Sequence, residues 1–156
     1  MHIEFLVEDS SGEKMLAQLV PKILGAHGAP HTWRMKAYKG IGRIPPGLSV
    51  KADPTKRMLL DQLPRLLQGY GKTVGIDAVV VVLDTDRRDC STFLTELKSL
   101  LAKCNPAPRT LFRLAIEEME AWYLGDRQSI LNRDCPLAQS ACATQPSLPM
   151  ISNGYH

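Results

Sequence analysis

The sequence predicts a three-layer α/β/α domain built on a mostly parallel sheet. Two observations predict the α/β class. Short apolar segments rich in β-branched residues alternate with segments in which apolar residues recur at helical spacing. Residues 76–83, IDAVVVVL, form an almost continuous apolar run, which is typical of a strand covered on both faces of a parallel sheet.

The first predicted unit is a strand followed by a helix. Residues 2–7, HIEFLV, are strand formers, and residues 9–12, DSSG, interrupt them. Apolar residues then recur at helical spacing as far as Leu24. We expect Ser10 or Ser11 to cap the amino end of this helix, because serine is a favoured N-cap residue.

The second unit is interrupted by a long loop. Residues 31–38 are expected to form a strand, and the Gly- and Pro-rich stretch that follows to residue 54 predicts a loop. Helical spacing resumes over residues 55–69. Pro64 is expected to kink or divide that helix, because proline cannot donate the helical hydrogen bond.

The remaining predicted elements follow the strand at 76–83. Residues 91–103 have an amphipathic helical pattern, and residues 110–116 a strand pattern. A short helix is expected in the segment EEMEAWYLGD that comes next. We therefore expect one α/β domain over residues 1–131 and an irregular tail over residues 132–156, where the apolar period fades.

Composition limits the class of protein. Hydrophobic residues make up 44% of the 156 residues and charged residues 22%, as in globular proteins. There is no apolar run of about 18 residues and no cleavable signal pattern, so we expect a cytoplasmic protein without a membrane partner. The 4 cysteines form no CxxC pair, which predicts free thiols and argues against a zinc site.

Acidic residues gather where predicted strands end. Glu8 follows the first strand, Asp84 and Asp86 follow the central strand, and Glu118 and Glu120 follow the last. Parallel strands point their carboxyl ends to one edge of a sheet, where ligands bind, so these acids are expected to converge there. Convergent carboxylates favour a hard cation, Mg²⁺ or Mn²⁺. The alternative is that such acids cap helices and offset the helix dipole.

The net charge of +3 does not by itself indicate nucleic acid, but its distribution is uneven. Residues 34–57 hold 7 basic residues and one acid, Asp53. The candidates for nucleic-acid binding are Arg34, Lys36, Lys39, Arg43 and Lys51. The alternative is an ordinary solvated surface. Trp33 and Tyr38 nearby could stack on bases or serve as packing residues.

Two of these motifs resemble a Toprim domain, the fold shared by topoisomerases, primases and the overcoming-lysogenisation-defect nucleases. FLVEDSSGEKML and VVVVLDTDRRD match, in order, its glutamate after the first strand and its DxD after a later strand. The resemblance implies a Toprim-like, Rossmannoid fold, in which Glu8, Asp84 and Asp86 bind Mg²⁺ and act in catalysis.

A closer resemblance is to the bacterial Toprim-related family called domain of unknown function 4276. It covers roughly residues 1–131 and is most specific in the block IEEMEAWYLGD. It implies that Glu118 or Glu120 accompanies the Toprim acids, and that the partner is an ATPase encoded in a mobile-element or phage-defence locus. The family continues with a further block that residues 132–156 lack, which predicts a truncated or frameshifted C-terminus.

Two functions follow from these observations. The first is a Mg²⁺-dependent nuclease, in which Glu8 acts as general base or metal ligand and Asp84 and Asp86 hold the ion. The acids Glu118 or Glu120 would complete the metal ligands, and the basic residues would grip the phosphate backbone. The alternative is a non-catalytic Toprim-like module that docks onto an ATPase and whose acids are structural.

Overall fold

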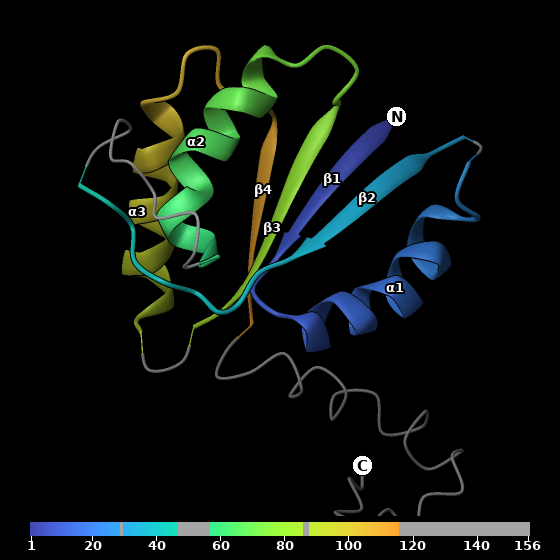
Figure 1. The fold of residues 1–156 in the computed structure, drawn as a ribbon, viewed down its shortest axis with the longest axis horizontal. Coiled ribbons are helices and arrows are strands. Elements are labelled where there is room, and N and C mark those ends of the chain that lie inside the picture. The colour runs from blue at the N-terminus through green and yellow to red at the C-terminus, as the bar shows by residue number, and fades with distance from the viewer. Residues whose placement is uncertain (29, 47–56, 86–87, 116–156) are drawn as a thin grey trace, which may run out of the picture. The chain divides into compact units, whose positions relative to one another are not determined.

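The computed structural model describes residues 1–28, 30–46, 57–85 and 88–115. Its elements are β1 (His2–Val7), α1 (Ser10–Leu24), β2 (Thr32–Ala37), α2 (Leu59–Lys72), β3 (Ala78–Asp84), α3 (Cys90–Ala102) and β4 (Thr110–Ala115). The four strands form one sheet in the order β2-β1-β3-β4, and each neighbouring pair is parallel. Helices α2 and α3 lie on one face of the sheet and α1 lies on the other (Figure 1). The predicted three-layer α/β class is confirmed.

Strand alternation produces two separate cores. In β1, Leu6 joins the core beneath α2 and α3, whereas Ile3, Phe5 and Val7 join the core beneath α1. Successive side chains of a strand point to opposite faces, so a strand covered on both faces needs apolar residues at nearly every position. This requirement explains the continuous run of β3, in which Val79, Val81 and Leu83 join the first core and Val82 joins the second.

The amino end of α1 differs from the prediction. Asp9, not Ser10 or Ser11, is the N-cap, and its carboxylate accepts a hydrogen bond of 2.8 Å from the backbone nitrogen of Gly12. Ser11 instead donates its hydroxyl to the Asp9 carboxylate at 2.9 Å. Aspartate and serine are equally good N-caps, so sequence alone does not decide between neighbouring candidates. The helix ends at the predicted place, before Gly25 with φ +86°.

Helix α2 begins at Leu59 and continues to Lys72, later at both ends than expected. Pro64 lies inside it and does not divide it, which corrects one of the two predicted outcomes. Pro64 is buried together with Leu60, Leu63 and Leu67. The tertiary packing of this face offsets the hydrogen bond that proline cannot donate.

Several predictions fall outside the described residues. These are the helix expected after β4, the domain boundary at residue 131 and the tail to residue 156. Cys90 and Cys104, the two cysteines that the structure describes, are free thiols as expected. In the same part of the chain, no helix has both the length and the apolar character needed to cross a membrane.

Candidate functional site

Glu8 and Asp84 meet at the carboxyl edge of the sheet. The Oε2 atom of Glu8 accepts a hydrogen bond of 3.0 Å from the backbone nitrogen of Asp84, across 76 residues of sequence. The two residues are neighbours because β1 and β3 pair in parallel with Val7, the last residue of β1, opposite Val82, two residues before the end of β3. Both side chains are half-buried. The expected proximity of these two acids is therefore confirmed, and their roles stay predictions.

The backbone around this edge is well defined on both sides of Glu8. Thr85 is 1% exposed, and its backbone nitrogen and hydroxyl both donate to the carbonyl oxygen of Ala115, at 2.9 and 3.0 Å. Its side chain thus turns toward the end of β4. On the other side, the nitrogen of Gly40 donates to the Glu8 carbonyl oxygen at 3.0 Å. Hydrogen bonds from Gly40, after β2, and from Asp84, the last residue of β3, therefore hold the backbone and the side chain of Glu8.

The other predicted acids, Asp86, Glu118 and Glu120, lie outside the described residues. Within the described ranges, no group of three or more His, Cys, Asp or Glu side chains could hold a metal ion. Mg²⁺ is commonly bound by only one or two protein carboxylates, with waters and substrate phosphates as its other ligands. The carboxylates of Glu8 and Asp84 are oxygen donors of the kind that this ion takes.

The alternative role for strand-end acids applies to two others. Asp9 caps α1, as described, and Asp89 caps α3. The Asp89 carboxylate accepts hydrogen bonds from the Ser91 hydroxyl at 2.7 Å and from the Thr92 backbone nitrogen at 2.8 Å. These bonds, that from Ser91 first, lower the pKa of Asp89 to about 2, because they favour its charged form. The acids near the strand ends are therefore of two kinds. Asp9 and Asp89 cap helices, whereas Glu8 and Asp84 contact each other at the edge of the sheet.

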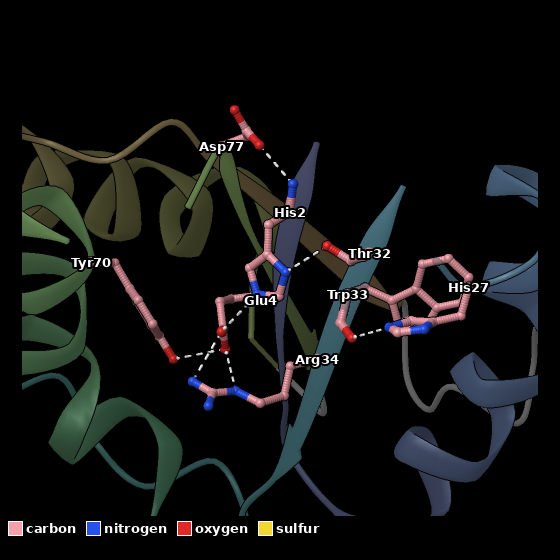
Figure 2. Close-up of polar contacts among 8 residues, drawn as sticks. All are labelled: His2, Glu4, His27, Thr32, Trp33, Arg34, Tyr70 and Asp77. Atoms are coloured by element: carbon pink, nitrogen blue, oxygen red, sulfur yellow. Dashed lines mark hydrogen bonds and ion pairs between the residues drawn. The ribbon is translucent and has the colours of Figure 1, made fainter. Parts of the chain in front are cut away.

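A second polar cluster lies on the face of β1 and β2 that α2 covers (Figure 2). Its centre is the carboxylate of Glu4, which is only 2% exposed. Arg34 binds it through two nitrogens, with Nη2 2.9 Å from Oε1 and Nε 3.2 Å from Oε2. The two residues face each other because the register of β1 and β2 pairs Glu4 with Arg34. This bidentate arrangement is the strong form of a carboxylate–guanidinium pair.

Two further side chains complete the Glu4 cluster. The Tyr70 hydroxyl, from α2, donates to Oε2 of Glu4 at 3.3 Å, and His2 Nε2 lies 3.2 Å from Oε1 (Figure 2). The hydrogen bond to Glu4 raises the pKa of Arg34. Burial, and then the charge of Glu4, raise the pKa of Tyr70. The cluster thus surrounds a buried carboxylate with hydrogen-bonding side chains from three elements, β1, β2 and α2.

Sequence reasoning missed the Glu4 cluster. The signal was present, because Glu4 is a charged residue inside the apolar run of residues 2–7, and a buried charge requires a partner. The partner depends on strand pairing, which the sequence does not display.

The basic residues that were expected to bind nucleic acid are mostly on the surface. Arg34, Lys36, Lys39 and Arg43 are exposed, and Lys51 lies outside the described residues. Of the two aromatic candidates, Tyr38 is 6% exposed and belongs to the core beneath α2 and α3, which is the packing alternative. Trp33 is half-buried and meets the ring of His27 edge-on at 4.8 Å.

Comparison of the sequence with protein-family models and with characterised proteins finds no match, and neither does comparison with solved structures. The resemblance to the Toprim-related family therefore stays a prediction. The geometry of the strand ends and of the Glu4 cluster is therefore the basis of the functional proposal.

Proposed function

We propose that this protein is a nuclease that hydrolyses phosphodiester bonds at the carboxyl edge of its sheet, with Mg²⁺ or Mn²⁺ as cofactor. The observation that supports the proposal is the 3.0 Å hydrogen bond between the Glu8 carboxylate and the backbone nitrogen of Asp84. It brings two acidic residues from distant parts of the chain to the edge where α/β sheets bind ligands.

The donor set favours a divalent cation. The Glu8 carboxylate contacts the backbone of a second acidic residue, Asp84, and carboxylate oxygens are the ligands that Mg²⁺ and Mn²⁺ prefer. Asp84 would hold the ion with Asp86, and Glu118 or Glu120 would add a ligand, as the family resemblance implies. When bound, such an ion polarises a phosphate oxygen and stabilises the charge that develops on it.

The role proposed for Glu8 is that of general base. The Asp84 N–H holds its Oε2 atom in one place, so the carboxylate is oriented before substrate arrives. It would take a proton from a water molecule as the water oxygen bonds to phosphorus and the bond from phosphorus to the leaving oxygen breaks. The leaving oxygen then takes up a proton from solvent. Basic residues of the segment 34–57 would hold the phosphate backbone during this step.

A cleavage assay tests the proposal. The full chain is incubated with single- and double-stranded DNA and RNA and with Mg²⁺ or Mn²⁺, with and without an ATPase encoded beside it. Asp84→Asn and Glu8→Gln are each expected to slow cleavage by at least about 100-fold. Asp77→Asn is a matched control, because Asp77 precedes β3 at the opposite end of the sheet and accepts a hydrogen bond from the backbone of His2.

Two results would contradict the proposal. One is the absence of cleavage with either ion and any of the four substrates. The other is cleavage by Asp84→Asn at the rate of the unmodified protein, which would identify a contaminating nuclease. Either result would favour the alternative of a non-catalytic module that docks onto an ATPase.

A further inference from the structure

Stability alone does not account for the buried carboxylate of Glu4. The residue is 2% exposed on a sheet face where its neighbour Leu6 and its counterparts in β3 are apolar. Replacing a buried ion pair with apolar residues of similar size is often neutral or stabilising, because the pair must be removed from water. A carboxylate at this position therefore calls for a reason other than packing.

The geometry of the pair suggests that reason. Both Glu4 oxygens are bound by Arg34, through Nη2 and Nε, and this fixes the plane of the guanidinium. The Arg34 side chain is nonetheless 69% exposed. One edge of the guanidinium is thus anchored inside the protein while the side chain remains accessible to solvent. Figure 2 shows Arg34 reaching from β2 across to Glu4 on β1.

Lys36 extends this arrangement toward the candidate active site. It lies two residues after Arg34 in β2 and is paired with Leu6, so both basic side chains stand on the same face. Two strand residues rise about 6.6 Å, which is similar to the separation of successive phosphates along one nucleic-acid strand. Since β1 and β2 are parallel, the direction from Arg34 to Lys36 is also the direction from Glu4 to Glu8.

The charge balance of this face favours an anion. Arg34 and Lys36 are exposed, and so is Arg65 of α2. Burial raises the pKa of Tyr38 on this face, and the positive charge of Arg65 acts in the opposite direction, so Arg65 lies close enough to add to the positive charge here. The charge of Glu4 on this face is compensated by its ion pair with Arg34, while Lys36 and Arg65 stay exposed. Positive charge therefore remains after the Glu4–Arg34 pair is formed.

We propose that Arg34 and Lys36 bind successive phosphate groups of one nucleic-acid strand that runs along β2 toward Glu8, and that Glu4 is a positioning residue for Arg34. This inference rests on the proposed function for the class of its ligand. Arg34 would contact a phosphate through the guanidinium N–H groups that are not bonded to Glu4. Glu4 would affect the affinity for nucleic acid by orienting Arg34, without contacting the nucleic acid itself.

Binding measured without divalent ions tests the proposal independently of cleavage. Fluorescence anisotropy is recorded in EDTA with labelled single-stranded DNA and RNA oligonucleotides of one sequence, over a range of salt concentrations. Lys36→Gln is expected to reduce the slope of log affinity against log salt by about 0.7, the value for one lost phosphate contact. Lys22→Gln, on α1 at the other face of the sheet, is the matched control and should leave the slope unchanged.

Two variants of the ion pair separate positioning from charge. Arg34→Lys keeps the charge and loses the planar fork, and it is expected to weaken binding by about tenfold. Glu4→Gln removes a negative charge, which on Coulombic grounds alone would tighten binding. A positioning role predicts the opposite, a several-fold weaker affinity. Circular dichroism and thermal melting of each variant establish that it is folded.

Several outcomes would overturn the proposal. These are no binding of either oligonucleotide by the unmodified protein, equal effects of Lys36→Gln and Lys22→Gln, or tighter binding by folded Glu4→Gln. Failure of the proposed function would look different, because Asp84→Asn is expected to bind these oligonucleotides at least as well as the unmodified protein. Loss of cleavage with intact, Lys36-dependent binding would leave the phosphate site standing.

Discussion

At the scale of single residues, the described part of the chain contains two kinds of acid near the strand ends and a buried acid, Glu4. Asp9 and Asp89 accept hydrogen bonds from the first turns of their own helices, so their chemistry is local. Glu8 accepts a hydrogen bond from a different strand, and Glu4 is bound by residues of β2 and α2. The contacts that join distant parts of the chain are those that support the proposed function.

The Glu4–Arg34 pair predicts an asymmetric effect of mutation on stability. Arg34→Leu leaves a carboxylate that is 2% exposed without its main counter-ion, and we expect it to lower the free energy of unfolding by about 3 kcal/mol. Glu4→Leu leaves an arginine that can extend into water, so its cost should be below about 1 kcal/mol. Urea unfolding measures both. Equal losses, or a larger loss for Glu4→Leu, would contradict the burial of Glu4 beside an exposed Arg34.

At the scale of elements, the close packing of α2 against a neighbouring turn decides which of its glycines an alanine can replace. In α2, a side chain added at Gly71 would overlap the carbonyl oxygen of Pro106, whereas one added at Gly69 would meet nothing within 4 Å. Glycine inside a helix is less favourable than alanine. The two positions therefore differ in what an alanine would do.

Gly69→Ala is expected to raise the free energy of unfolding by about 0.5 kcal/mol, through helix propensity. Gly71→Ala is expected to lower it by about 1–3 kcal/mol, because α2 must shift away from the turn that contains Pro106. Thermal melts of the two variants measure the difference. If both raise the melting temperature, α2 does not pack against this turn.

The cap of α3 predicts how stability depends on pH. The folded pKa of Asp89, about 2, lies below its ordinary value of 3.8. The charged cap therefore stabilises the fold above about pH 4, and this contribution is lost as pH falls toward 2. Asp89→Asn keeps a capping side chain that does not titrate. Its melting temperature should fall below that of the unmodified protein at pH 6 and converge with it near pH 2, and a constant difference would contradict this account.

At the scale of the whole molecule, the sequence was sufficient for the order of elements and for one part of the site. The apolar run of β3 and the alternation of strands and helices predicted a parallel sheet, and the parallel sheet predicted that Glu8 and Asp84 meet. The Glu4–Arg34 pair could not be predicted in this way, because it depends on the register of β1 against β2. The predicted cap of α1, Ser10 or Ser11, was wrong, because Asp9 beside them caps equally well and the sequence does not rank the two residue types.

The most direct test of the central claim is a calorimetric titration of Mn²⁺ into the full chain and into Asp84→Asn and Asp77→Asn. The account predicts a saturable site in the unmodified protein that is kept in Asp77→Asn, and an affinity at least about tenfold lower in Asp84→Asn. No binding by the unmodified protein, or equal affinity in Asp84→Asn, would contradict a metal site at the end of β3.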